Sequence, residues 1–113
     1  MIPNRLFRCT GPLLLGLIMV HVPCLSQGDW EQIFFDDFQQ AHTNNWTLEE
    51  GWTLTQIESN YVLEGVGHCW ARCLEGSYWN DYDFQCKFRL NQGEMHVNFR
   101  VSALGRYMLG IGE

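Results

Sequence analysis

The chain of 113 residues is poor in basic residues, with seven lysines and arginines against 13 aspartates and glutamates. Nucleic-acid binding needs basic patches that displace counterions from phosphates, so this acidic balance argues against a nucleic-acid partner. A role at an anionic membrane surface is disfavoured for the same reason. The sequence also lacks a serine-centred nucleophile elbow, a phosphate-binding loop and a dinucleotide fingerprint. Enzyme classes that depend on those motifs are therefore not indicated.

Beyond residue 26 the sequence has no low-complexity segment, no internal repeat and no convincing helical period. It has instead an alternation of apolar and polar side chains, which is most regular in three runs near the C-terminus, 82–90, 94–103 and 106–111. Side chains of a strand point alternately to opposite faces, so these runs predict an antiparallel meander with one buried face. Earlier segments rich in β-formers predict further short strands at 30–38, 52–57, 61–64 and 68–74. The expected fold class is all-β, a sandwich or barrel.

The first 26 residues have the composition of a secretory signal. Arg5 and Arg8 form a basic start, residues 12–22 are largely apolar, and Cys24 and Ser26 place small residues where a signal peptidase reads. The apolar run is too short to span a bilayer comfortably. We therefore predict an N-terminal signal helix over 1–26 and a single secreted, extracytoplasmic domain over 27–113, without membrane contact after cleavage. An uncleaved membrane anchor and a lipoprotein acylated at Cys24 are the alternatives.

The predicted domain is small and acidic. Arg5 and Arg8 precede it, so five basic and all 13 acidic residues fall in 27–113, for a net charge of −8. It also contains three cysteines, Cys69, Cys73 and Cys86. On an extended strand the first two lie about 13 Å apart, too far to bridge each other. A link from either of them to Cys86 is one expectation, and three buried free thiols are the other.

The residues favour no metal site and no cofactor. His68 and His96 belong to no spaced histidine pair or carboxylate triad, and the Cys-x-x-x-Cys spacing lacks the second pair that a zinc site needs. Asp36 and Asp37 could contribute to a calcium site of the kind that sandwich domains use. An acidic turn that protects a sheet edge from aggregation is the alternative.

Polar and aromatic side chains share one face of two predicted strands. Tryptophan stacks on the apolar face of a pyranose, while arginine, asparagine and histidine donate hydrogen bonds to hydroxyls in fixed directions. We therefore predict a carbohydrate-binding face, with one further tryptophan on a loop. The alternative is an ordinary solvated outer face. The candidate ligand-binding residues are Trp70, Arg72, His96, Asn98, Arg100 and Trp79.

A series of short motifs extends over roughly residues 30–113. They are Phe35-Asp36-Asp37-Phe38, Trp46, Gly51-Trp52, Leu63-Glu64-Gly65, Trp79-Asn80-Asp81-Tyr82-Asp83-Phe84, Lys87-Phe88-Arg89-Leu90, Asn98-Phe99-Arg100 and Gly105-Arg106-Tyr107. Their order resembles the concanavalin A-like jelly rolls of secreted bacterial proteins, in particular the 3-keto-disaccharide hydrolase-like domain, also described as family-sixteen glycosidase-like or laminin-G-like. The resemblance implies an antiparallel β-sandwich of jelly-roll type with a sugar site on its concave face.

Two departures from that family bear on function. Such domains run to about twice this length, since a two-layer sandwich must bury both inner faces, so we expect an incomplete sandwich. The Glu-x-Asp-x-x-Glu cluster of true family-sixteen glucanases is also absent. A retaining glycosidase needs two carboxyl groups about 5–5.5 Å apart. Asp81 and Asp83 have that spacing on a strand but stand at a loop-to-strand junction, so no catalytic residue is predicted.

Three functions follow as expectations. The first is a secreted carbohydrate- or glycan-binding module without its own catalytic machinery. The second is a glycoside hydrolase-like enzyme of the 3-keto-disaccharide hydrolase type, present as a fragment. The third is a structural or adhesive domain that binds a partner through its sheet. An uncovered apolar sheet face would favour self-association or a covering partner chain, because large apolar patches are rarely left in water.

Overall fold

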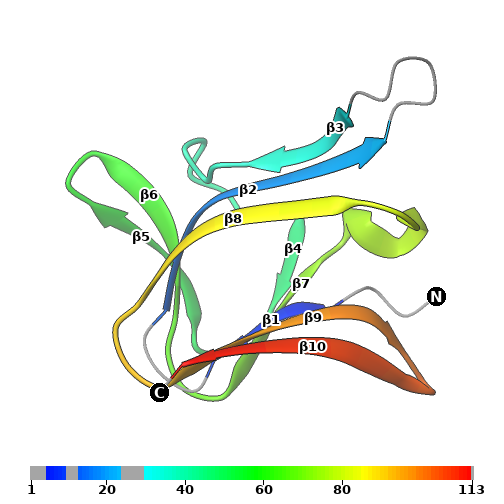
Figure 1. The fold of residues 1–113 in the computed structure, drawn as a ribbon. Helices are drawn as coiled ribbons and strands as arrows, with labels where there is room; N and C mark the ends of the chain where they lie inside the picture. The colour runs from blue at the N-terminus through cyan, green and yellow to red at the C-terminus, as the bar shows by residue number, and fades with distance from the viewer. Residues whose placement is uncertain (1–4, 10–12, 24–29, 113) are drawn as a thin grey trace.

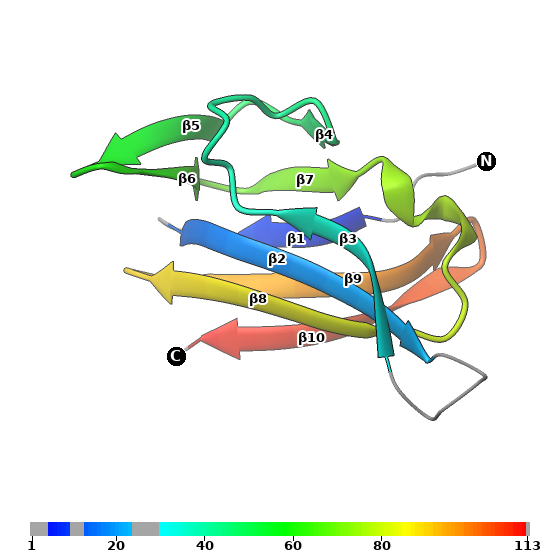
Figure 2. The same cartoon turned by 90° about the horizontal axis from the view of Figure 1, so that it is seen from above.

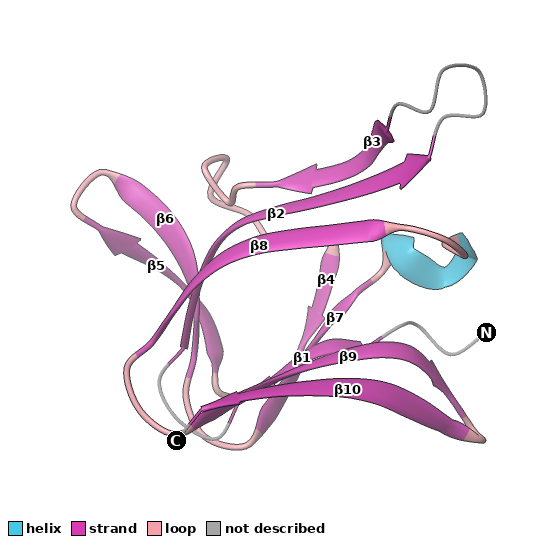
Figure 3. Ribbon diagram, viewed as in Figure 1, coloured by secondary structure: helices cyan, strands magenta, loops and turns pink. Residues whose placement is uncertain are grey.

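The computed structural model describes residues 5–9, 13–23 and 30–112, and these form mostly β-structure (Figures 1 and 3). A short 3-10 turn, η1 (Glu75–Tyr78), precedes the eighth strand. No helix among these residues is long and apolar enough to cross a bilayer. The strands are β1 (Arg5–Cys9), β2 (Leu13–Pro23), β3 (Trp30–Asp36), β4 (Trp46–Leu48), β5 (Trp52–Ile57), β6 (Asn60–Gly65), β7 (Cys69–Cys73), β8 (Asp83–Leu90), β9 (Glu94–Ser102) and β10 (Gly105–Gly112).

The strands form two antiparallel sheets around one core. The first sheet has the order β10-β9-β1-β7-β4, and the second has the order β3-β2-β6-β5 with β8 paired along β2. Figure 2 shows that the axes of the long strands in the two sheets are nearly aligned with one another. The inner faces contribute a cluster of apolar side chains, and the predicted all-β, sandwich-like fold is confirmed. The cluster comprises Leu15, Ile18, Val20, Phe34, Phe38, Trp46, Trp52, Leu63, Cys69, Ala71, Cys73, Met95 and Val97.

The predicted three-strand meander is wrong in one respect. β9 and β10 form a hairpin, with Leu109 opposite Val97, as the alternation predicted. β8 instead leaves this sheet and pairs with β2 in the other one, with Phe84 opposite Val20. Periodicity reports which face of a strand is buried but not which strand lies beside it. The 91–93 turn therefore connects two sheets rather than two neighbouring strands.

The N-terminal segment is the largest difference from the sequence-based expectation. Residues 13–23 were expected in a signal helix outside the fold, but they form β2, a strand at the centre of the second sheet. β1 is likewise an inner strand of the first sheet, between β9 and β7. A continuous apolar run suits a strand in the middle of a sheet as well as it suits a signal, so the pattern alone does not separate them. Whether the segment also directs secretion stays a prediction.

Burial of β2 contributes substantially to the stability of the sandwich. Leu15, Ile18 and Val20 are 0% exposed. Burying three such side chains contributes about 5–9 kcal/mol. Small domains have a net stability of only about 5–15 kcal/mol, so this strand is a major part of what keeps the two sheets together.

A buried carboxylate fixes the turn after β3. Asp36 is 8% exposed, and its Oδ1 accepts a hydrogen bond from the Phe38 N–H at 2.9 Å. Its Oδ2 accepts from Trp46 Nε1 at 2.9 Å and from Asn45 Nδ2 at 3.2 Å. The Asp37 carboxylate lies outside this network, and its Oδ1 accepts a hydrogen bond from the exposed Gln39 N–H at 3.1 Å. Both oxygens of Asp36 therefore serve the fold, which supports a structural role for this acidic turn.

Two of the three cysteines of the predicted domain, Cys73 and Cys86, are free thiols in the structure. Cys69 and Cys73 are buried on the inner face of β7, and Cys86 is half-buried on β8. Burial raises the pKa of the Cys73 thiol to about 11, and burial likewise raises that of Cys86 to about 11. Both side chains therefore behave as small apolar core residues at neutral pH.

The first sheet extends beyond the cover that the second sheet provides. In Figure 2, β10 lies beyond β8, which lines the near side of the other sheet. Tyr107 and Leu109 stand opposite the inward-facing Phe99 and Val97, yet they are 71% and 54% exposed. The inner face of β10 is thus largely uncovered.

Candidate functional site

Four of the six predicted ligand-binding residues lie on one face of the first sheet. β7 carries Trp70 and Arg72, and β9 carries His96 and Asn98. Position 8 of β1 pairs with both Trp70 and His96, which places those two residues in one row across the sheet. At about 4.8 Å per strand they are about 10 Å apart. The structure therefore places these four residues on one face of the sheet.

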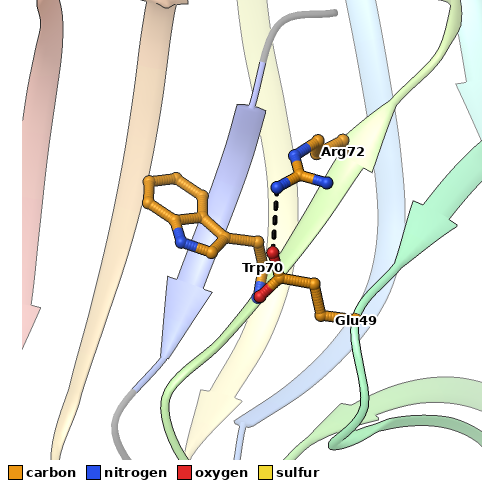
Figure 4. A network of polar contacts seen from close by, with 3 residues as sticks. All are labelled: Glu49, Trp70 and Arg72. Carbon is orange, nitrogen blue, oxygen red and sulfur yellow. Dashed lines mark hydrogen bonds and ion pairs between the residues drawn. The ribbon is translucent and has the colours of Figure 1, made fainter.

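Arg72 and Trp70 are engaged by Glu49, which follows β4 (Figure 4). Glu49 Oε1 lies 2.8 Å from Arg72 Nη2, and its Oε2 accepts a hydrogen bond from the Trp70 N–H at 3.0 Å. The Glu49 N–H in turn donates to the Trp70 carbonyl at 3.0 Å. The Arg72 side chain is 17% exposed. The Glu49 side chain thus extends the hydrogen-bonded pairing of β4 with β7. No motif in the sequence indicated a role for this residue.

The remaining groups on this face are also committed to the protein. The Arg106 guanidinium lies 5.2 Å from the centroid of the Trp70 ring, a cation–π contact that covers one face of the indole. His96 Nε2 is 3.2 Å from Glu94 Oε2. Asn98 is 0% exposed, its Nδ2 donates to the His96 carbonyl at 3.4 Å, and its Oδ1 has no partner among the described residues. Little of this face is left for a ligand.

Arg100 is separated from the other residues of its strand by a β-bulge. Between Phe99 and Ser102 the β9 strand has one residue more than β10 opposite it, and Arg100 adopts a φ of 50°. A bulge redirects the side chains around it. Arg100 Nη2 accordingly donates to the Asn80 carbonyl at 2.6 Å, and Asp81 Oδ1 is 3.8 Å from the same nitrogen. Arg100 therefore belongs to a second location.

That second location is an open cleft of about 480 Å³ where the uncovered end of β10 meets the start of β8 and the end of β9. Trp30, at the start of β3, and Tyr107 present rings that are 55% and 71% exposed. The polar groups beside them come from the loop before β8 and from the bulge. The lining residues are Trp30, Asn80, Asp81, Tyr82, Phe84, Phe99, Arg100 and Tyr107.

A row of ring contacts supports the aromatic wall of the cleft. Tyr82 lies 6.5 Å from Phe99 between ring centroids, and Phe84 lies 6.1 Å from Phe99. Trp79, the sixth predicted ligand residue, packs behind this wall, with its ring centroid 5.6 Å from that of Tyr82 and 5.6 Å from that of Phe34. The structure thus places Trp79 in support of the cleft and apart from the Trp70 face.

The electrostatics of the cleft are balanced. Asp81 and Arg100 carry opposite charges, and the Asp81 side chain is 92% exposed. Burial raises the pKa of Tyr82, with the nearby Arg100 charge acting in the opposite direction, so the phenol is neutral at physiological pH. Its hydroxyl is buried without a hydrogen-bond partner among the described residues. Tyr82 therefore keeps both a donor and an acceptor beside the cleft.

The sequence did not indicate this cleft. The alternation assigns Tyr82, Phe99 and Tyr107 to the buried face of their strands, and such residues are normally core filler. They border an opening because β10 extends past the opposite sheet. The alternation of side chains along a strand does not show how far each sheet extends, so the sequence did not indicate the opening. The motif around Asn80 and Asp81 was the available signal, although it was interpreted as structural.

No metal-binding arrangement is found in the part of the chain that the structure describes. There, no group of three histidine, cysteine, aspartate or glutamate side chains lies close enough together to hold an ion. Within the cleft lining Asp81 is the one carboxylate, and Asp83 instead accepts a hydrogen bond from Gln85 Nε2 at 3.1 Å.

Comparisons with known proteins give no assignment: the chain matches no protein-family model, no curated protein and no solved structure. The resemblance to concanavalin A-like jelly rolls therefore depends on the sequence motifs alone.

Proposed function

We propose that this protein is a secreted carbohydrate- or glycan-binding β-sandwich module without its own catalytic machinery, and that its ligand site is the cleft between β8, β9 and β10. The observation that supports this most directly is that exposed aromatic rings and charged side chains line the same cleft. Trp30 and Tyr107 offer apolar faces to a sugar ring, and Asp81 and Arg100 offer an acceptor and donors to its hydroxyls.

Size and charge narrow the ligand class. A hollow of about 480 Å³ falls in the range of small-ligand sites, about 300–1,000 Å³. Because Asp81 and Arg100 offset each other, the cleft has no net charge that would select a phosphate or a polyanion. A neutral mono- or disaccharide unit at the end or along the side of a glycan fits this chemistry best.

The cleft is favoured over the originally predicted face because its groups are more available. On that face Arg72 is paired with Glu49, one side of Trp70 is covered by Arg106, and Asn98 is fully buried. In the cleft, Tyr107 and Asp81 are largely exposed to solvent. Ligand binding there displaces water from the rings and leaves the Arg72–Glu49 ion pair in place.

The test is glycan binding by the folded protein and by matched tyrosine variants. Screening against immobilised glycans, followed by calorimetry on the best ligand, should show that Tyr107→Ala weakens binding about tenfold or more, which corresponds to about 1.4 kcal/mol. Tyr78→Ala is the control, since Tyr78 is 79% exposed but lies on η1 outside the cleft lining. If Trp70→Ala abolished binding while Tyr107→Ala left it unchanged, the site would be the originally predicted face.

The hydrolase alternative is less well supported by the geometry. A glycosidase of the usual kind needs two carboxyl groups, and Asp81 is the one carboxylate among the described residues that line the cleft. Release of sugar from a glycoside, lost on substitution of Asp81 by asparagine, would nevertheless establish it in place of a binding module.

A second candidate function, an adhesive or structural domain, is favoured by the uncovered strand β10. Tyr107, Met108 and Leu109 are 71%, 51% and 54% exposed along a strand that, among the described strands, pairs only with β9. Free sheet edges with apolar side chains promote strand-to-strand association. Sedimentation over a range of concentrations should then show a dimer that Leu109→Lys dissociates. A monomer at all concentrations would exclude self-association through β10.

A further inference from the structure

The segment that looks like a secretory signal occupies the centre of the sandwich. β2 pairs with β8 along one edge, from Leu13 opposite Leu90 to His21 opposite Asp83. Along its other edge it pairs first with β6 and then with β3. Three strands of residues 30–112 thus depend on this one strand for backbone hydrogen bonds.

The side chains of β2 are those expected of a strand in the middle of a sheet. Leu15, Ile18 and Val20 belong to the buried core, whereas Met19, between two of them, is only half-buried. The 20 residues between Arg8 and Asp29 contain no aspartate, glutamate, lysine or arginine. An uncharged apolar run satisfies a strand bonded on both edges, which meets no solvent at its backbone.

We propose that residues 30–112 form a strand-accepting groove, bordered by β8 on one side and by β6 and β3 on the other, and that residues 13–23 of the same chain are its occupant. The N-terminal segment then has two exclusive states. It is either inserted as β2, which closes the sandwich, or withdrawn and available for recognition as a signal. Cleavage after a signal would leave the groove empty and three strands without their common partner.

The pairing of β2 also indicates what kind of strand the groove accepts. It runs antiparallel to β8, β6 and β3 and carries branched apolar side chains that face the core. Addition of an extended segment to open sheet edges is a known mode of peptide recognition, in which main-chain hydrogen bonds provide affinity and alternate side chains provide specificity. Gly16 adds little selectivity, since a Cβ there would meet Lys87 only at ordinary distances of 3.8 and 3.9 Å.

A matched pair of substitutions separates a strand from a signal. Ile18→Lys and Met19→Lys add the same charge to neighbouring positions of the same apolar run, so they lower its overall hydrophobicity nearly equally. A signal that is read by its overall hydrophobicity should respond alike to both. A strand in the groove should respond differently to the two substitutions, because Ile18 is 0% exposed and Met19 faces the other side.

The experiment uses the full chain, with a specific protease site placed between β2 and β3 and cut after folding. We expect the N-terminal piece to stay bound through gel filtration and to separate only in denaturant. We also expect Ile18→Lys to lower the midpoint of thermal unfolding by ~10 °C or more, and Met19→Lys by only a few degrees.

Three outcomes would overturn the proposal. In the first, the cut N-terminal piece leaves at once while the remainder keeps its cooperative unfolding transition. In the second, the two lysine variants unfold at the same temperature. In the third, the cut remainder forms a stable dimer by itself, which would make a second copy the occupant of the groove.

Discussion

Asp36 offers the sharpest test of how this small sandwich is held together. We consider Asp36→Asn, which keeps the size and shape of the side chain but replaces one carboxylate oxygen with an amino group. The remaining oxygen still accepts the hydrogen bond from the Phe38 N–H. The new amino group, however, meets two donors, Trp46 Nε1 and Asn45 Nδ2, where an acceptor stood before.

The magnitude follows from the two lost bonds. A hydrogen bond to a charged group contributes about 1.5–3 kcal/mol, and leaving a buried donor without a partner costs a similar amount. The Trp46 bond is buried and counts in full, whereas Asn45 is only part-buried and retains access to water. Removing a buried charge offsets part of the loss. We therefore expect Asp36→Asn to lower the free energy of unfolding by about 2–4 kcal/mol.

The measurement is urea unfolding followed by tryptophan fluorescence, with Asp37→Asn as the control. Asp37 accepts one hydrogen bond from an exposed N–H, and an amide oxygen accepts the same bond, so its substitution should change stability by less than about 0.5 kcal/mol. Equal effects of the two substitutions, or a loss below about 0.5 kcal/mol for Asp36→Asn, would refute the assignment of Asp36 as the anchor of this turn.

Further predictions concern a glycine pair, the cysteines and the Glu49 contact. Gly51→Ala should lower the free energy of unfolding by about 2–4 kcal/mol, because Gly51 has a φ of 109° and an added Cβ would lie 2.5 Å from the Val66 carbonyl oxygen. Gly67→Ala is the control, since Gly67 has a φ of 86° but an added Cβ there would meet no atom within 4 Å. In the same urea assay it should lower the free energy of unfolding by only about 1 kcal/mol. Burial raises the pKa of Cys73 from 9.0 to about 11. The stability that the neutral thiol contributes is therefore fully present below pH 9 and declines as the pH rises toward 11. Urea unfolding midpoints that stay constant from pH 8 to 11 would contradict this prediction. Glu49→Gln should lower stability by up to about 1 kcal/mol, since the pair with Arg72 is partly exposed, and the loss should shrink at high salt.

The strands of the C-terminal half were predictable because their two faces differ. The alternation over 82–90, 94–103 and 106–111 matches β8, β9 and β10 to within one residue at each end. The short strand β4 was missed, since three residues are too few to show a period. The N-terminal strands were missed for the opposite reason, because a run that is apolar on every side carries no face information.

The candidate site shows the same limits at the level of single residues. Trp70 and His96 lie on one face of the sheet, as their alternating patterns indicated, but β1, a strand that the sequence did not predict, lies between β7 and β9. Arg100 was placed on that face as well, but one extra residue in β9 turned it toward Asp81. A bulge depends on pairing with the opposite strand, and the sequence of one strand does not display it.

The proposed binding site and the N-terminal segment are physically coupled. One wall of the cleft is carried by Phe84, whose strand pairs with β2 at Val20. The other wall is carried by Phe99 on β9, and β9 pairs with β1 at Val97 opposite Phe7. Withdrawal of β1 and β2 would therefore remove the partner strand of β8 and one of the two partner strands of β9, since β10 would stay paired with β9. We expect the distance across the cleft to be less well fixed in that state.

Glycan affinity should consequently follow the state of the first 23 residues. If the N-terminal strand closes the sandwich, a substitution such as Ile18→Lys should weaken binding although it lies outside the cleft lining, and Met19→Lys should weaken it much less. If affinity survives both substitutions unchanged, the cleft walls are held by contacts within residues 30–112 alone. Binding measured on this one pair thus reports whether the strand that resembles a signal is also required for recognition.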